Sequence, residues 1–134
     1  MIFSQFCYSN YCNDDPIAAS INSAAAKNIT VVIASGNDGN SAKISTPACI
    51  ENATAIGASD KNDNIASYSN RNSLVRLLAP GGLSTNSATQ INSTCISGGY
   101  CGNQGTSMST PHAAGTVALI NQFLRINNKT RNRK

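Results

Sequence analysis

One serine of this sequence stands where its surroundings could make it a nucleophile. Residues 105–115 read G-T-S-M-S-T-P-H-A-A-G, with Ser107 at the start of a helical apolar pattern. The first amides of a helix lack intrahelical acceptors and lie at the positive end of the helix dipole, so they favour negative charge beside the hydroxyl. The backbone N–H of Ser107 can therefore serve a developing oxyanion. The alternative is a serine that merely caps a core helix.

Two neighbours of Ser107 narrow the chemistry. A nucleophile elbow of the G-x-S-x-G type needs glycine where Ser109 stands, which disfavours an α/β-hydrolase. The sequence contains one histidine, His112, five residues beyond Ser107. In a helix that spacing is a rotation of about 140° and a rise of about 7.5 Å, so His112 cannot act as the base for Ser107. We expect His112 instead to be a core histidine of a buried helix.

A second segment, residues 31–39, reads V-V-I-A-S-G-N-D-G. Together the two segments resemble subtilisin-like serine proteases, whose nucleophile segment reads G-T-S-M-A-(S/T)-P-H-V-A-G. The matching second segment of that family, V-V-A-A-G-N-(E/D)-G, carries the side-chain donor of the oxyanion hole. The resemblance implies that Ser107 is the nucleophile and Asn37 that donor. It also assigns one wall of the substrate-binding pocket to Ala34, Ser35 and Gly36.

The resemblance covers about residues 15–123 and is incomplete. The family's Asp and His motifs, D-T-G and H-G-T-H-V-A-G, do not occur in this sequence. We therefore expect the C-terminal half of a serine endopeptidase domain, inactive alone, with the N-terminal half as a partner and a polypeptide as substrate. Two alternatives are a degenerate relative that keeps only the fold, and a secreted, disulfide-stapled binding module without catalysis. Neither a cofactor, a metal, a nucleic acid nor a membrane is expected as a partner.

Hydrophobic periodicity indicates the elements that position these residues. Apolar residues recur at helical spacing in two places, and β-branched runs without alternation are typical of parallel strands covered on both faces. The last helix has a broad apolar surface, so we expect it to be buried. The order of elements predicts an α/β fold with a parallel, subtilisin-like sheet, present in part. The predicted elements are a helix at 15–28, strands at 29–34, 53–58 and about 75–79, mostly loop at 83–105 and a helix at 106–124.

The composition, with 40% hydrophobic and 12% charged residues, indicates one soluble domain. We assign residues 1–124 to that domain and residues 125–134 to a basic, disordered tail. The tail holds five of the ten Lys and Arg residues and no acidic one. A nucleic-acid or membrane-surface patch is the alternative, but no aromatic residue interleaves with these charges.

The sequence contains five cysteines, and their spacing indicates the cellular compartment in which the protein folds. Cys7 and Cys12 bracket a short segment, as do Cys95 and Cys101, so we expect two local disulfides, with Cys49 left as a buried thiol. Neither spacing is that of a zinc site. Disulfides need an oxidising compartment, which predicts an extracellular or cell-surface location, although the first residues lack the pattern of a signal peptide. The sequence also contains four Asn-x-Thr sequons, at Asn28, Asn52, Asn92 and Asn128. Such N-glycosylation sequons fit an exported protein, but an Asn-rich sequence also produces them by chance.

Overall fold

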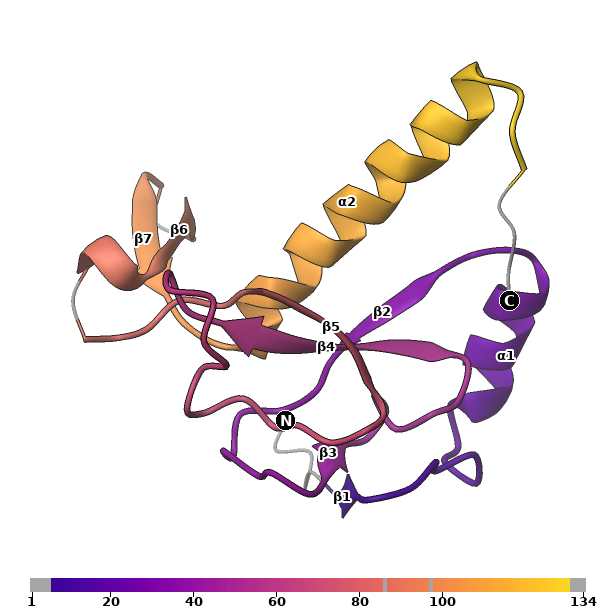
Figure 1. Ribbon diagram of the computed structural model, residues 1–134, viewed down its shortest axis with the longest axis horizontal. Helices are drawn as coiled ribbons and strands as arrows, with labels where there is room; N and C mark the ends of the chain where they lie inside the picture. Colours follow the sequence, from indigo (N-terminus) through magenta and orange to yellow (C-terminus); the bar gives the residue numbers. More distant parts are fainter. Residues whose placement is uncertain (1–5, 86, 97, 131–134) are drawn as a thin grey trace.

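The computed structural model describes residues 6–85, 87–96 and 98–130. A parallel sheet with one long helix across it forms the centre of the molecule, and smaller strand pairs lie around it (Figure 1). The elements are β1 (Cys7–Tyr8), α1 (Ala18–Ala26), β2 (Val31–Ala34), β3 (Ile44–Ser45), β4 (Ala53–Ser59), β5 (Val75–Pro80), the 3₁₀ turn Ser87–Thr89, β6 (Ile91–Thr94), β7 (Tyr100–Asn103) and α2 (Thr106–Ile126).

The central sheet has the order β2-β4-β5, and both of its pairings are parallel. Val31 pairs with Ala53 and Ala34 with Ile56, while Ala58 pairs with Ala79. The three predicted strands and their parallel arrangement are therefore confirmed. Because the strands are parallel, all three end at the same edge of the sheet, and the loops that follow them lie close together.

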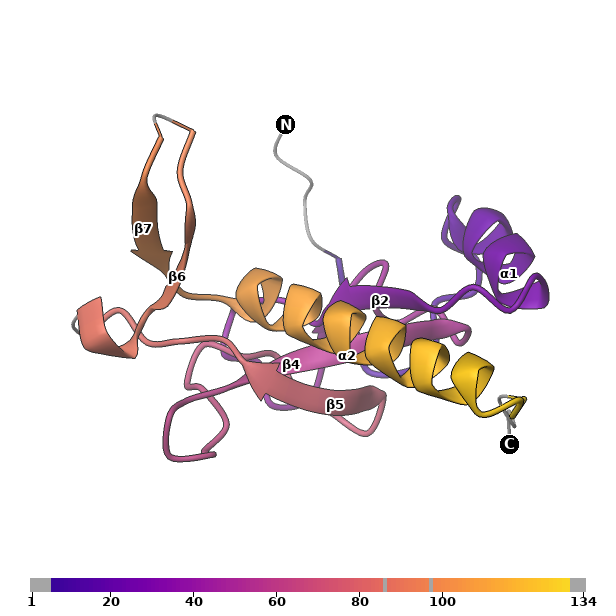
Figure 2. The same ribbon diagram turned by 90° about the horizontal axis from the view of Figure 1, so that it is seen from above.

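Apolar side chains of the sheet point to two sides. Val31 and Ile33 pack on a cluster formed by α1 and the segment around residues 44–55. Val32 lies on the opposite side, with Ile56 and Ala113 of α2. Figure 2 shows α2 lying across that side of the sheet. The expectation that the first strand is covered on both faces is confirmed for β2, whereas β5 leaves Leu77 and Leu78 exposed.

The burial expected for the last helix is only partly found. The side that faces the sheet is buried at Thr106, Ser109 and Ala113. Farther along, α2 extends past the sheet (Figure 1), and its large apolar side chains lie in solvent. The exposed fractions are 68% for Leu119, 60% for Phe123 and 70% for Ile126. No element among the described residues covers these side chains, so the prediction of a wholly buried helix is wrong for this chain.

Two boundaries also differ from the sequence-based expectation. Helix α1 begins at Ala18, and Asp15 lies just before it, accepting a hydrogen bond from the Ile17 N–H at 3.0 Å. Helix α2 continues to Ile126, two residues into the segment assigned to the tail. The last four residues of that tail lie outside the described part of the chain. Within the described residues, no helix is both long enough and apolar enough to span a membrane.

The segment predicted as loop contains a β-hairpin. Strands β6 and β7 pair antiparallel, with Asn92 opposite Gly102 and Thr94 opposite Tyr100. Gly98 and Gly99 turn the chain at the tip with φ angles of +84° and +77°, which favour glycine. The prediction that residues 83–105 are mostly loop did not include these two strands. The Gly-Gly pair between two short runs is the signal that could have revealed the hairpin.

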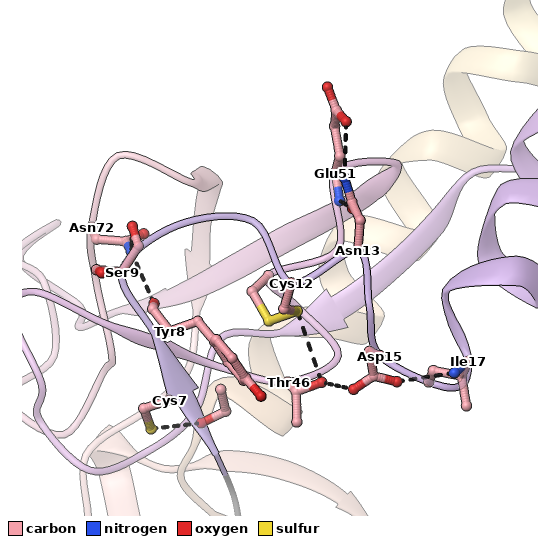
Figure 3. Close-up of a disulfide and its surroundings, with 12 residues drawn as sticks. Cys7, Tyr8, Ser9, Cys12, Asn13, Asp15, Ile17, Thr46, Glu51 and Asn72 are labelled. Atoms are coloured by element: carbon pink, nitrogen blue, oxygen red, sulfur yellow. Dashed lines mark hydrogen bonds between the residues drawn. A yellow bond between two sulfur atoms is a disulfide. The ribbon is translucent and has the colours of Figure 1, made fainter.

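The disulfides agree with the prediction in one case and contradict it in the other. Cys95 and Cys101 are bonded, which closes the hairpin as expected. The second bond joins Cys12 to Cys49 rather than to Cys7, and both partners are buried. Figure 3 shows this bond beside Thr46, whose hydroxyl donates to the Asp15 carboxylate. The strand β1 directs Cys7 elsewhere, with its sulfur 3.7 Å from the Ser45 hydroxyl.

Candidate active site

Each of the three central strands is followed by a residue that contacts the start of α2. The loop after β2 contributes Asn37, whose Oδ1 accepts hydrogen bonds from the Thr106 N–H at 2.8 Å and the Thr106 hydroxyl at 2.9 Å. The loop after β4 contributes Tyr68, whose hydroxyl accepts from the Gly105 N–H at 3.2 Å. The carbonyl of Gly81, directly after β5, accepts from the same N–H at 2.9 Å. The N-terminus of α2 is therefore fixed against the carboxyl edge of the sheet.

The orientation of the Asn37 side chain follows from its partner. A backbone N–H can only donate, so the Asn37 atom facing Thr106 must be the carbonyl oxygen Oδ1. The Nδ2 group then lies on the other side of the amide, where no hydrogen-bond acceptor is found among the described residues. A Cβ atom built on Gly105 would lie 3.4 Å from this Nδ2. The exposed Asn37 thus has a donor available beside the start of α2.

Ser107 is the second residue of α2 and is exposed to solvent. Its N–H belongs to the first turn, where helical amides have no acceptor within the helix, and none is found elsewhere in the described part of the chain. Gly105 precedes this turn with φ +141°, a conformation that residues with a side chain rarely adopt. Gly105 thereby lets the chain enter the helix with Ser107 facing outward. The structure brings Asn37 against Thr106, the residue directly before Ser107.

The predicted pocket wall is mostly interior. Ser35 and Gly36 are buried, and Ala34 at the end of β2 is partly buried. The Ser35 hydroxyl donates to the carbonyl of Asn70 at 2.7 Å, so its side chain points inward. A Cβ on Gly36 would collide with the side chains of Asn70 and Ser45. Of these three residues, Ala34 alone is not fully buried.

Asn70 is a site residue that sequence reasoning missed. It is fully buried, and its Oδ1 accepts from the N–H groups of Asp38 at 2.9 Å and Asn40 at 3.0 Å. Its Nδ2 donates to the Asp38 carboxylate at 3.0 Å and to the Ser45 hydroxyl at 3.2 Å. Asn70 therefore fixes the loop that carries Asn37, although it lies 33 positions away in the sequence. Asn70 lies within the stretch that resembles the family, but no role was assigned to it, because an asparagine before Arg71 reads as an ordinary turn residue.

Tyr68 is the second residue that the sequence did not reveal. Its hydroxyl donates to the Gly82 carbonyl at 2.8 Å while it accepts from Gly105. Burial raises the pKa of the Tyr68 hydroxyl, and the Gly105 N–H opposes this shift because it stabilises the phenolate. The neutral hydroxyl is the form that can make both bonds. Tyr68 thus joins the entrance of α2 to the chain just after β5.

His112 lies where the sequence analysis placed it, on the wrong part of the helix to reach Ser107. Its Nδ1 is 2.8 Å from the Met108 carbonyl, one turn earlier, so Nδ1 carries the proton that this bond requires. The side chain is exposed, which contradicts the expectation of a core histidine. That expectation assumed a buried helix, and this side of α2 is uncovered in the described residues. No other histidine exists in the sequence.

Comparison with known proteins assigns the class. The family model described as the subtilase family matches residues 7–133. The chain belongs to the subtilase family. Over 102 residues it is 43% identical to "Subtilisin BL" of Lederbergia lenta, and this alignment covers 76% of this chain and 35% of the relative. Over 109 residues it is 40% identical to "Proteinase T" of Parengyodontium album, covering 78% of this chain and 35% of the relative.

Solved structures agree with this assignment. A cold-adapted subtilisin-like serine proteinase aligns with a TM-score of 0.68 and 34% identity, over 82% of this chain and 37% of that chain. A protease of Pseudoalteromonas arctica PAMC 21717 aligns with a TM-score of 0.75 and 32% identity, over 87% of this chain and 37% of that chain. The expected subtilisin-like fold is confirmed. The chain spans about a third of the length of the curated relatives just named.

Proposed function

We propose that this chain is the nucleophile-bearing part of a subtilisin-like serine endopeptidase that cleaves polypeptides. The observation that carries the proposal is the first turn of α2, where Ser107 is exposed and two N–H donors lack partners in the described residues. One donor is the backbone N–H of Ser107 and the other is Nδ2 of Asn37. Family membership supports serine protease chemistry at this position.

In the proposed reaction, Ser107 Oγ adds to the carbonyl carbon of the scissile peptide bond. Negative charge then develops on the carbonyl oxygen, which Asn37 Nδ2 and the Ser107 N–H stabilise in the transition state. Loss of one such donor in a subtilisin costs about 2.7–4 kcal/mol of barrier lowering. Because Thr106 holds Oδ1 of Asn37 from two directions, Nδ2 needs no reorganisation when the oxyanion forms.

The base that removes the Ser107 proton is proposed to come from outside these 134 residues. The sequence lacks the family's Asp and His motifs, and His112 is already bonded to Met108. Loss of the base or nucleophile in a subtilisin costs on the order of 10⁶ in turnover, so chain 1–134 alone should be inactive. The N-terminal half of a subtilase domain is the proposed source of both missing residues.

The exposed face of α2 supports such a partner. Leu119, Phe123 and Ile126 are spaced four and three residues apart, so they share one side of the helix. A helix that is apolar on opposite sides is normally buried on both. We propose that the missing half packs on this side. Two disulfides also support an extracellular or cell-surface location.

The test joins this chain to the coding sequence upstream of it, provided that sequence encodes the Asp and His motifs. The joined protein should hydrolyse peptides, and an organophosphonate should label Ser107, because labelling needs an activated hydroxyl. Ser107→Ala should abolish both. Ser109→Ala is a matched control on the same helix turn, since Ser109 is buried and should leave both unchanged. Hydrolysis retained by Ser107→Ala, or hydrolysis by chain 1–134 alone, would contradict the assignment.

A further inference from the structure

The four sequons are the one motif set of the sequence that the proposed function does not use. All four acceptor asparagines are exposed in the structure: Asn28, Asn52, Asn92 and Asn128. Exposure alone does not separate them, but their surroundings do. Asn52 uses its Nδ2 to donate to Asn22 at 3.0 Å, so a sugar on that nitrogen would disturb a contact of the fold. Asn28 and Asn128 directly follow the last turns of α1 and α2.

Asn92 has different surroundings. It lies in β6 of the hairpin, which stands clear of the sheet in both ribbon views (Figures 1 and 2). Its side chain makes no hydrogen bond within the described residues. Successive strand residues point to opposite faces, so Asn92 and Thr94, the two sequon positions that an oligosaccharyltransferase recognises, lie on the same face. Both side chains are exposed.

The pairing register adds an aromatic ring to this face. Thr94 pairs with Tyr100, and Asn92 pairs with Gly102, whose side-chain position is occupied by the side chain of Gln90. Tyr100 is therefore the diagonal neighbour of Asn92 on the same face, within reach for a large side chain. It is 82% exposed, and nothing in the described residues covers its ring. A sugar attached at Asn92 would find an apolar ring surface beside it.

We propose that Asn92 is an N-glycosylation site whose first sugar packs on Tyr100. The donor is a polyprenyl-diphosphate-linked oligosaccharide. A bond forms between Nδ2 of Asn92 and C1 of the sugar, the bond from C1 to the diphosphate oxygen breaks, the polyprenyl diphosphate leaves with the electron pair, and Nδ2 loses one proton. No oxidant or reductant is needed. In eukaryotic cells the oxidising lumen in which disulfides such as Cys95–Cys101 form is also where this transfer occurs.

The site is compatible with the rest of the molecule. The Cys95–Cys101 bond lies one residue beyond the sequon, so the hairpin register that brings Tyr100 beside Asn92 is covalently closed. The candidate nucleophile lies beyond the base of the hairpin, in α2, so a glycan on Asn92 leaves the Asn37 contact with Thr106 untouched. The inference is independent of whether the chain hydrolyses peptides.

The first experiment secretes the full 134-residue chain from eukaryotic cells and maps the peptide that holds Asn92 and the Cys95–Cys101 bond by mass spectrometry. Treatment with a peptide N-glycosidase in heavy-oxygen water should convert Asn92 to labelled Asp. Thr94→Ala should lower occupancy at least about tenfold because it removes the sequon hydroxyl, while the matched change Ser93→Ala should keep it. An unmodified Asn92 in chains that carry the Cys95–Cys101 bond would overturn the proposal.

The second experiment tests the packing on Tyr100. In the glycosylated chain, ring currents of Tyr100 should shift proton resonances of the first sugar upfield. Tyr100→Phe should keep that shift, and Tyr100→Ala should remove it. A glycan whose proton resonances are the same in the wild type and Tyr100→Ala would overturn the packing on this ring.

Discussion

Replacing Asn70 by alanine should loosen the loop that carries Asn37. The substitution removes four side-chain hydrogen bonds, two to the amides of Asp38 and Asn40 and two to the side chains of Asp38 and Ser45. A protein hydrogen bond contributes about 1 kcal/mol net, and partners left buried cost more. Asp38 is exposed and can bind water instead, which keeps the estimate at the low end. We therefore expect the free energy of unfolding to fall by about 3–4 kcal/mol.

The assay is urea denaturation of chain 1–134 together with amide hydrogen exchange. Exchange should accelerate most at the amides of Asp38 and Asn40, which lose their acceptor, and less in β4. Asn64→Ala is the matched control, since the exposed Asn64 side chain makes a single long contact of 3.5 Å to Asp60. Its loss should stay below about 0.5 kcal/mol. An Asn70→Ala loss no larger than the control, with unchanged exchange at Asp38 and Asn40, would refute Asn70 as the anchor of this loop.

Three further predictions concern stability. Replacing Cys12 and Cys49 together by serine should lower the free energy of unfolding, measured by urea denaturation, by about 4 kcal/mol. Replacing Cys95 and Cys101 should lower it by about 2 kcal/mol, because the two disulfides close loops with sequence separations of 37 and 6 residues. Equal losses would contradict the loop-length argument. The Thr46 hydroxyl lowers the pKa of Asp15, so the stability that Asp15 contributes is present above about pH 4 and is lost as the pH falls through the lowered value. Asp15→Asn should flatten this acid limb of a stability profile, and an unchanged limb would argue against it. Ser109→Ala should leave the stability unchanged or raise it by up to about 1 kcal/mol, because the buried Ser109 hydroxyl has no hydrogen-bond partner in the described residues. A loss of stability in thermal denaturation would show that this hydroxyl does have a partner.

The sequence predicted the features that depend on local patterns. The run at residues 31–34 is short, rich in β-branched residues and followed by turn residues, and the apolar residues after Ser107 recur at helical spacing, so β2 and the start of α2 were predictable. Family resemblance then added Asn37, which lies 70 residues from Ser107. The structure brings the two to the same helix turn through Thr106.

The features that depend on distant pairings could not be predicted in this way. Cys12 has a nearer cysteine in the sequence at Cys7, but the backbone N–H of Cys12 bonds to the carbonyl of Cys49 and brings those two together. Asn70 acts through contacts across 25 to 35 residues, which no spacing rule detects. The exposure of Phe123 depends on what covers α2, which periodicity cannot supply.

The hairpin between β5 and α2 also determines where this chain can change length. Its base is tied on both sides, because the Gly105 N–H bonds to Gly81 and the Leu83 N–H bonds to Thr89. One residue inserted within the first turn of α2, between Thr106 and Ser107, would rotate Ser107 by about 100° about the helix axis and displace it by about 1.5 Å, turning it away from Asn37. Residues inserted at the tip, beside Gly98, would only lengthen the arm. Natural insertions should therefore collect at this tip, and an engineered epitope or recognition peptide could be grafted there without moving the helix.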